Sequence, residues 1–401
     1  MSKQIQEAYI VAATRTPVGK APKGVFRNTR PDDMLAHVLK SVVAQAPGID
    51  VSRIDDAIIG CAMPEAEQGM NVARIGLLLA GLPNTIAAQT INRFCSSGLQ
   101  AVAMAADQIR LGHADLMLAG GTESMSMVPM MGNKVALSPS VFRDDHVAIA
   151  YGMGITAEKV AEEWKVSREE QDAFALASHQ KAIAAIAAGE FASEISPYEI
   201  TAQLPDLAGN AVRLKKSLVD TDEGPRADST LEGLAKLRPV FRNGQFGGSV
   251  TAGNSSQMSD GAGAVLLASE QAIKDYGLTP LARFVSFSVA GVRPEVMGIG
   301  PIAAIPKALK QAGLTKDQLD WIELNEAFAA QALAVIRDSE LDPAKINPLG
   351  GAIALGHPLG ATGAIRTATI VHGMRRHQKK YGMVTMCIGT GMGAAGIFES
   401  L

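Results

Sequence analysis

Cysteines, aromatic residues and long apolar runs are all scarce in this sequence. Cys61, Cys95 and Cys387 are its only cysteines. They lie far apart and form no C-x-x-C pair, which argues against a disulfide framework and against a structural zinc site. No stretch approaches the roughly 18 uninterrupted apolar residues of a membrane-spanning helix, and residues 1–7 hold no apolar signal core. We therefore expect no membrane span, no metal site and a reducing, cytoplasmic compartment.

Acidic and basic residues are nearly balanced. The 401 residues include 37 Lys and Arg against 40 Asp and Glu, a net charge of −3, so nothing suggests nucleic acid as a partner. With 47% hydrophobic residues, the chain is long enough for two or three globular domains. Its 40 glycines favour tight turns between strands and helices and close approach of the backbone to a ligand.

Strand and helix patterns alternate in two separate parts of the chain. Residues 1–121 predict strands near 8–13, 56–61, 86–91 and 115–121, with helices near 32–44, 72–79 and 99–111. Residues 280–401 repeat the plan, with strands near 282–289, 321–324 and 383–387 and helices near 302–311, 327–336 and after Gly360. The apolar strands predict buried, mostly parallel sheets, and the repetition indicates a duplicated α/β unit.

The duplication also reveals an insertion. In the second half a tight turn at 389–393 joins the last two strands, whereas in the first half the same connection runs from 122 to 249. We therefore predict an N-terminal half (1–121 plus 250–271), an inserted loop domain (122–249) and a C-terminal half (272–401). Within the insertion we expect helices at 156–164 and 169–188, the second starting at a capping box of Ser167 and Glu170.

A cysteine stands where a predicted strand meets a predicted helix. The apolar run 86–91 predicts a buried strand, and NRFCSSG (92–98) places Cys95 in the turn before the helix at 99–111. At a helix start, free N–H groups and the helix dipole lower a thiol pKa from about 8.5 towards neutrality. A single buried cysteine is more often a packing residue, so a catalytic role for Cys95 depends on partners elsewhere in the chain.

Four further stretches carry residue types suited to such a role. GGAIALGHPLGATG (350–363) surrounds His357 with five glycines, and MCIGTG (386–391) places Cys387 at a strand end. Two cysteines on duplicated halves would face one site, one as nucleophile and the other as acid/base. In NEAFA (325–329), Asn325 either holds a water in an oxyanion hole or caps a helix. VTAGNSS (250–256) is a small polar loop suited to an amide-bearing ligand.

These five stretches follow one another along the chain as NRFCSSG, VTAGNSS, NEAFA, GGAIALGHPLGATG and MCIGTG. Together they resemble the thiolase family of acyl-CoA:acetyl-CoA C-acyltransferases. The resemblance implies an α/β thiolase fold: two duplicated βαβαβαββ halves in a layered αβαβα core, with an inserted loop domain. It also implies that Cys95 forms the acyl thioester, that His357 is its base and that Cys387 is the acid/base for acetyl-CoA. Asn325 would hold a water at the enolate oxygen, and the N–H groups of Cys95 and Gly389 would form a second oxyanion hole.

The resemblance further implies which residues contact coenzyme A or the reacting thioester: Arg226, Ser256, Ala252, Met153, Met297 and Phe328. Gly233 stands where relatives often have a serine that contacts the cofactor, and Gly152 replaces a histidine that marks short-chain members. Because glycine leaves room at 152, we expect a degradative 3-ketoacyl-CoA thiolase of fatty acid β-oxidation. Such an enzyme uses CoA to cleave 3-ketoacyl-CoA into acetyl-CoA and a shortened acyl-CoA. An acetoacetyl-CoA-forming biosynthetic thiolase and a 3-ketoadipyl-CoA thiolase are the alternatives.

The resemblance implies no permanently bound cofactor, because CoA and acyl-CoA are substrates. As partners we expect further copies of the chain, in a dimer or tetramer, and the family also admits a hydratase/dehydrogenase subunit. Two rival classes are a decarboxylating ketoacyl synthase and a non-catalytic acyl-CoA carrier on the same fold. Cys387 argues against the synthase, and the presence of Cys95, His357 and Asn325 beside it argues against the carrier.

Overall fold

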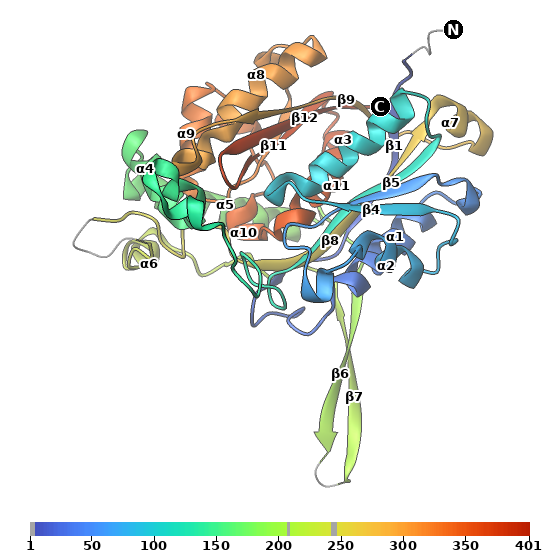
Figure 1. Cartoon of the computed structure of the whole chain (residues 1–401), viewed down its shortest axis with the longest axis horizontal. Helices are drawn as coiled ribbons and strands as arrows, with labels where there is room; N and C mark the ends of the chain where they lie inside the picture. The colour runs from blue at the N-terminus through green and yellow to red at the C-terminus, as the bar shows by residue number, and fades with distance from the viewer. Residues whose placement is uncertain (1–4, 207–208, 242–246) are drawn as a thin grey trace.

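A mixed ten-stranded sheet forms the centre of the computed structural model, which describes residues 5–206, 209–241 and 247–401. The strand order is β10–β11–β12–β9–β1–β8–β5–β3–β4, and the short β2 pairs with β8 beside this path (Figure 1). The strands of this sheet are β1 (Ala8–Arg15), β2 (Gly19–Lys20), β3 (Asp56–Gly60), β4 (Ala87–Ile91), β5 (Leu116–Ser124), β8 (Ser259–Ser269), β9 (Ala282–Gly291), β10 (Trp321–Leu324), β11 (Tyr381–Ile388) and β12 (Met392–Ser400).

The sheet consists of two halves with the same strand order. β4–β3–β5–β8–β1 forms the N-terminal half and β10–β11–β12–β9 the C-terminal half, and a short ladder between β1 and β9 joins them at Ile10 and Ala282. Where β4 would recur in the second half, the structure has only a single parallel bridge between Ile322 and Ile346. The duplication predicted from the sequence is therefore present, with one strand of the second copy reduced to a bridge.

Helices form three layers around the two half-sheets. α3 (Ser97–Arg110) and α11 (Leu359–Arg376) lie between the halves and contact both (Figure 1). The outer faces are covered by α1 (Pro31–Ala44) and α2 (Val72–Leu79) on the first half, and by α8 (Gly300–Ala312) and α9 (Ala329–Asp338) on the second. Because α11 is enclosed on all sides, almost all of its residues are buried and it lacks an amphipathic pattern.

Two expectations about the sheets are wrong. β8 runs antiparallel to both of its neighbours, β1 and β5, as β12 does to β9 and β11, so the sheets are mixed and not mostly parallel. β4 is not a buried strand: it lies at the edge of the sheet, with Ala87 and Gln89 exposed. A short apolar run does not distinguish a central strand from an edge strand.

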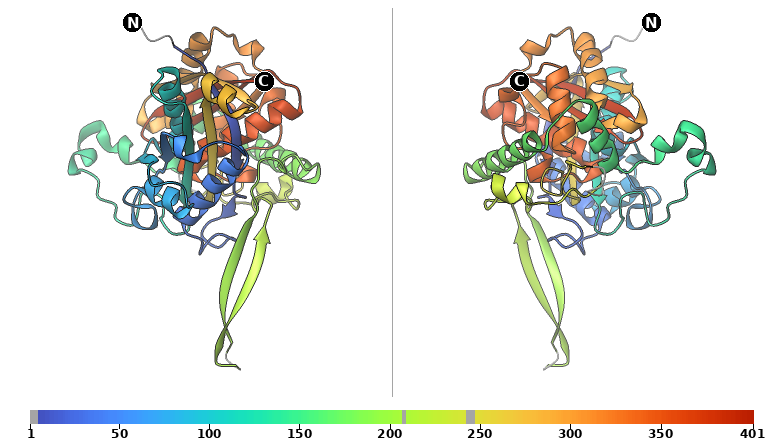
Figure 2. Two further views of the ribbon diagram at one scale, coloured as in Figure 1. Left: turned by 90° about the vertical axis from the view of Figure 1, so that its right-hand side faces the viewer. Right: turned by 90° about the vertical axis from the view of Figure 1, so that its left-hand side faces the viewer.

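The long connection between β5 and β8 contains the predicted helices, α4 (Met153–Glu163) and α5 (Arg168–Ala187), followed by the short α6 (Leu231–Ala235). The capping box before α5 is confirmed: the Ser167 N–H donates to Glu170 Oε2 at 2.8 Å, and the Glu170 N–H donates to Ser167 Oγ at 3.2 Å. The connection also forms a hairpin of β6 (Tyr198–Asp206) and β7 (Ala211–Val219) that projects from the body (Figure 2), which the sequence analysis missed.

A buried ion-pair network ties this connection to the sheet. Arg15 of β1, 2% exposed, donates to Glu194 Oε1 at 2.6 Å and to both carboxylate oxygens of Asp222 at 2.7 and 2.9 Å. Thr369 of α11 donates to the same Glu194 oxygen at 2.9 Å. The network therefore joins the sheet, the central helix and two points of the connection.

The remaining helices are short: α7 (Glu270–Tyr276) follows β8, and α10 (Ala352–Leu355) precedes α11. Among the described residues, no helix is both long enough and apolar enough to cross a membrane.

The contact between α3 and α11 depends on glycine. A Cβ atom added at Gly98 would lie 2.6 Å from the backbone nitrogen of Ala364, so Gly98→Ala must push the helices apart. We expect the free energy of unfolding to fall by about 1–3 kcal/mol. Gly152→Ala is the matched control, because its added Cβ meets no atom within 4 Å, and we expect a change within about 0.5 kcal/mol. Urea unfolding measures both variants, and equal stability would contradict the close packing.

Candidate active site

Cys95 lies on a strained turn between β4 and α3. The turn is a 3₁₀ segment, η3 (Phe94–Ser96), and Phe94 has a φ of 44°, in the left-handed region that bulky residues rarely adopt. Side chains on both sides hold this conformation. Asn92 Oδ1 accepts the Phe94 N–H at 2.8 Å, and the Ser97 hydroxyl donates to the Phe94 carbonyl at 2.7 Å. Strain that neighbouring groups hold in place is typical of functional sites.

The prediction that the helix start lowers the pKa of Cys95 towards neutrality is wrong. The pKa of its thiol is raised to about 12: burial raises it most, the N–H groups of Gly389 and of Cys95 itself lower it, and the Glu123 carboxylate adds a smaller rise. The helix dipole acts over only about one turn, and loss of water around the sulfur outweighs it here. In this state the sulfur is therefore a thiol, and it requires a base before it can attack. The two N–H groups near the sulfur are those expected to form an oxyanion hole.

His357 lies in the glycine-rich loop just before α11 and is 4% exposed. The Asn325 Nδ2 lies 3.3 Å from His357 Nε2, and because an amide NH₂ only donates, Nε2 carries no proton. The proton is therefore on Nδ1, which lies 2.7 Å from the Thr362 hydroxyl. Burial, and then the Arg366 guanidinium, lower the pKa of His357 to about 3. The imidazole is neutral, with a lone pair on Nε2 available to accept a proton.

Cys387 and Asn325 lie on neighbouring strand ends. Cys387 is fully buried at the end of β11, and burial, followed by the proximity of Cys95, raises the pKa of its thiol above the ordinary value. Asn325 follows β10 and is 1% exposed, and its Oδ1 has no hydrogen-bond partner among the described residues. A buried acceptor without a partner is costly, so this oxygen is suited to hold a water or a ligand donor.

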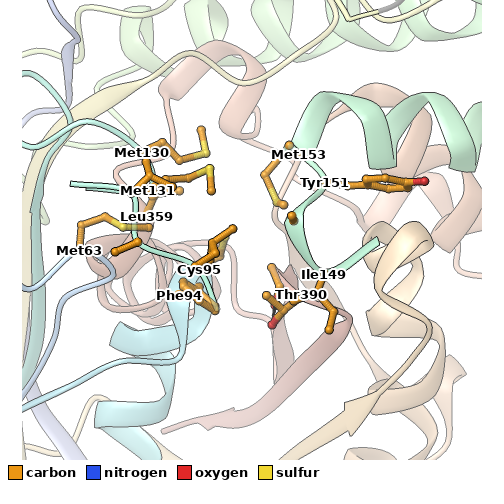
Figure 3. Close-up of a pocket in the computed structure, with 16 residues that line it drawn as sticks. Met63, Phe94, Cys95, Met130, Met131, Ile149, Tyr151, Met153, Leu359 and Thr390 are labelled. Atoms are coloured by element: carbon orange, nitrogen blue, oxygen red, sulfur yellow. Dashed lines mark hydrogen bonds between the residues drawn. The ribbon is translucent and has the colours of Figure 1, made fainter. Parts of the chain in front are cut away.

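A cavity of about 280 Å³ opens above Cys95 (Figure 3). Met63, Met130 and Met131 lie on one side of the sulfur in this view, and Met153 on the other. The remaining lining residues are Phe94, Val135, Ala136, Leu137, Ile149, Ala150, Tyr151, Gly152, Leu359, Gly389 and Thr390. None of the lining residues is charged, so the cavity is suited to an uncharged chain, and flexible methionine side chains can adjust to its shape.

Of the six residues predicted to contact CoA or the thioester, some lie together beside Cys387 and others lie on exposed loops. Met153, Met297 and Phe328 pack with Cys387 in one buried cluster. Ser256 lies nearby, with its N–H donating to the Ala327 carbonyl at 3.0 Å. Ala252 is exposed on the loop that carries Ser256. Arg226, also exposed, lies on a loop between β7 and α6.

Sequence reasoning missed Glu123, a fully buried carboxylate beneath the site. It accepts the N–H groups of Ala62 at 2.7 Å, Gly360 at 2.9 Å and Met63 at 3.3 Å, and the amide of Gln68. Burial raises its pKa above the ordinary value, and these donors lower it by less. Because every partner donates, it is held as a carboxylate. The available signal was a charged residue within the otherwise uncharged strand 116–124.

Thr362, which fixes the His357 tautomer, was also missed. Its hydroxyl lies one turn into α11, five residues after His357. Thr362 is part of the stretch GGAIALGHPLGATG, but the sequence alone assigned it no role. Among the described residues, no group of three or more His, Cys, Asp or Glu side chains is arranged to hold a metal ion.

Comparisons with known proteins agree on one family. Residues 8–271 match the family "Thiolase, N-terminal domain" and residues 278–400 match "Thiolase, C-terminal domain". The chain is 52% identical to a 3-ketoacyl-CoA thiolase of Bacillus subtilis, covering 98% of this chain and 100% of that protein. It is 47% identical to the peroxisomal 3-ketoacyl-CoA thiolase A of Mus musculus, covering 98% and 91%.

A solved structure is similar over its whole length. The acetyl-CoA acetyltransferase of Bacillus anthracis superposes with a TM-score of 0.88 at 39% identity, covering 100% of both chains. The fold class expected from the sequence is thereby confirmed.

The Thr362–His357 contact predicts how fast Cys95 reacts with an alkylating agent. Thr362→Val keeps the shape but leaves the Nδ1 proton without an acceptor, which costs about 1.4 kcal/mol. We expect alkylation of Cys95 by iodoacetamide at pH 7 to slow about tenfold, measured by mass spectrometry of the Cys95 peptide. Thr362→Ser keeps the hydroxyl and should react as the unmodified protein does. Equal rates for the two variants would show that Thr362 does not control the imidazole.

Proposed function

The chain belongs to the thiolase family, and we propose that it cleaves 3-ketoacyl-CoA with coenzyme A, giving acetyl-CoA and an acyl-CoA two carbons shorter. The observation that carries this proposal is the uncharged cavity of about 280 Å³ that ends on Cys95, with the N–H of Gly389 at the sulfur. The 52% identity to a 3-ketoacyl-CoA thiolase over nearly the whole chain supports the reaction and the direction. Repeated removal of two carbons suits fatty acid β-oxidation.

The first half-reaction uses the base and the nucleophile. His357 Nε2 accepts the Cys95 proton, and the thiolate attacks the C3 carbonyl of the substrate. The negative oxygen of the tetrahedral intermediate accepts the N–H groups of Cys95 and Gly389, and loss of one such donor typically costs about 3 kcal/mol of barrier. The C2–C3 bond then breaks, its electron pair goes to the enolate of acetyl-CoA, and the acyl group remains on Cys95 as a thioester.

The second thiol, that of Cys387, protonates the enolate that leaves as acetyl-CoA. The enolate oxygen accepts hydrogen bonds from protonated His357 and from a water held by Asn325, and Cys387 donates its proton to the enolate carbon. Protonated His357 then returns a proton to the Cys387 thiolate, which restores both groups. In the second half-reaction His357 accepts the proton of the incoming CoA thiol. That thiolate takes the acyl group, and Cys95 leaves and recovers its proton from His357.

The lining of the cavity argues against the two alternative substrates, 3-ketoadipyl-CoA and acetoacetyl-CoA. A 3-ketoadipyl chain ends in a carboxylate, which the uncharged lining would leave buried without a cation, at a cost of several kcal/mol. A short-chain biosynthetic enzyme would have a histidine where this chain has Gly152, and the space around Gly152 is open. Both observations favour uncharged acyl chains longer than acetoacetyl.

The remaining assignments rest on the family alone. For CoA binding we propose Arg226 near the adenine, Ser256 near the pantetheine, and Met153, Met297 and Phe328 at the thioester. Ala252 is a further proposed CoA or substrate contact. We also propose the division into halves 1–121 plus 250–271 and 272–401, with the inserted domain at 122–249. A homo-oligomer, a hydratase/dehydrogenase partner and a cytoplasmic location complete the proposal.

Serine variants of the two thiols should fail at different steps. Cys95→Ser should form no acyl-enzyme and lose at least about 10³-fold in kcat, because a hydroxyl is a far weaker nucleophile here. Cys387→Ser should still take up an acyl group, seen by intact-mass spectrometry, but should exchange the α-proton of acetyl-CoA at least about 10²-fold more slowly. Cys61→Ser is the control: Cys61 is buried outside the cavity, and because a serine hydroxyl can still donate towards Glu123 Oε1 as the thiol does, this variant should stay active. Full activity of Cys387→Ser would refute its assigned role.

The cavity also predicts substrate preference. Each methylene buried in an apolar cavity contributes about 0.8 kcal/mol, so kcat/KM for a six-carbon 3-ketoacyl-CoA should exceed that for acetoacetyl-CoA by about tenfold. 3-Ketoadipyl-CoA should be at least about 100-fold poorer than the uncharged six-carbon substrate. Steady-state thiolysis measures all three. A strong preference for acetoacetyl-CoA would overturn the chain-length assignment, and absence of cleavage at every length would overturn the function.

A further inference from the structure

The loop that carries Arg226 is held in place by contacts outside the cavity. The Asp222 carboxylate binds Arg15 and accepts the Val18 N–H at 2.8 Å. The Glu223 carboxylate accepts the N–H groups of Lys20 at 2.8 Å and Val25 at 3.0 Å. These partners hold the first part of the loop, residues 222–223, but not its exposed end at Arg226.

A buried histidine holds that end. His179 of α5 is 6% exposed, and its Nδ1 accepts the backbone N–H of Arg226 at 3.2 Å. Burial lowers the pKa of His179, as do the positive charges of Arg226 and Lys20, whereas Asp228 raises it. His179 is therefore neutral near pH 7, with the proton on Nε2 and the lone pair of Nδ1 directed at Arg226.

We propose that His179 is a positioning residue for the nucleotide half of coenzyme A. It fixes the main chain at Arg226, so that the exposed guanidinium meets the nucleotide without first being ordered, which reduces the entropy cost of binding. The proposal rests on the proposed function, because it takes Arg226 as a CoA contact. His179 itself touches neither the thiol nor the acyl chain.

The test compares two thiol acceptors. Coenzyme A contains the nucleotide, whereas pantetheine has the same reactive thiol and lacks it. His179→Leu removes the Nδ1 acceptor, and we expect the KM for CoA to rise about five- to tenfold, the effect of one hydrogen bond. The KM for pantetheine and the kcat with either acceptor should change less than twofold. His179→Asn places an amide oxygen close to the position of Nδ1 and should restore the KM for CoA. His113→Leu, at an exposed histidine, controls for loss of an imidazole.

A double-mutant cycle tests whether His179 acts through Arg226. In the Arg226→Ala background, His179→Leu should change the KM for CoA less than twofold, because the guanidinium it positions is absent. A pH series adds an independent readout. Below the ordinary histidine pKa of about 6.5, protonation removes the acceptor and adds repulsion from Arg226 and Lys20. The KM for CoA should therefore rise more steeply on acidification in the unmodified protein than in His179→Asn.

The outcomes separate this inference from the proposed function. Failure of the unmodified protein to cleave any 3-ketoacyl-CoA with either acceptor would overturn the function. Normal cleavage together with an unchanged KM for CoA in His179→Leu would overturn the positioning role alone. An equal rise in KM for CoA and pantetheine would also overturn it, because a general disturbance of the fold does not distinguish the two acceptors.

Discussion

A buried carboxylate that receives N–H groups from both halves of the molecule is the contact on which the site depends. The proposed nucleophile, Cys95, comes from the first half and the proposed base, His357, from the second, so the contacts that join the halves near them set their separation. Glu123 accepts the N–H of Ala62, at the end of β3, and the N–H of Gly360, in the first turn of α11. A buried charge is tolerated only when its hydrogen bonds are satisfied, so the carboxylate fixes both segments. The close approach requires glycine at 360, where a Cβ would lie 2.6 Å from the backbone nitrogen of Ala62 and 2.8 Å from Glu123 Oε2.

The same burial keeps the reacting groups neutral until a substrate arrives. Cys95 and Cys387, the two thiols proposed to react, have raised pKa values and His357 has a lowered one, because loss of water on burial penalises the charged form of each group. A thiolate–imidazolium pair would therefore form only when its charges are offset, by N–H groups at the sulfur and by developing charge on the substrate. The proposed enolate requires a site closed to bulk water, since water free to reach its carbon would protonate it in place of Cys387, whereas a water fixed by Asn325 contacts only its oxygen.

Much of this arrangement can be predicted from the sequence, and each exception has a physical reason. The duplicated order of strands and helices, the capping box at Ser167 and the turn at Cys95 follow from local patterns, which act over a few residues. The antiparallel direction of β8 and the edge position of β4 depend on pairing between distant strands. Glu123 and Thr362 were missed because a carboxylate or hydroxyl gains its role only from donors and acceptors that folding brings near. The pKa of Cys95 was mispredicted because a helix start is visible in sequence and desolvation is not.

In the proposed reaction, the two duplicated halves supply the residues that react, and the long connection between β5 and β8 supplies residues that select the substrate. The residues proposed to react, Cys95, His357, Asn325 and Cys387, all lie at or next to strand ends or helix starts of the two halves, where backbone geometry is rigid. The two ends of the proposed substrate meet the connection instead: methionines at 130, 131 and 153 line the acyl cavity, and the loop at 222–226 carries Arg226. The buried ion pair of Arg15 with Asp222 anchors this connection to the sheet, and within the connection His179 holds the main chain at Arg226. Changes in the connection can thus alter which chain or acceptor binds without moving the groups proposed to transfer protons.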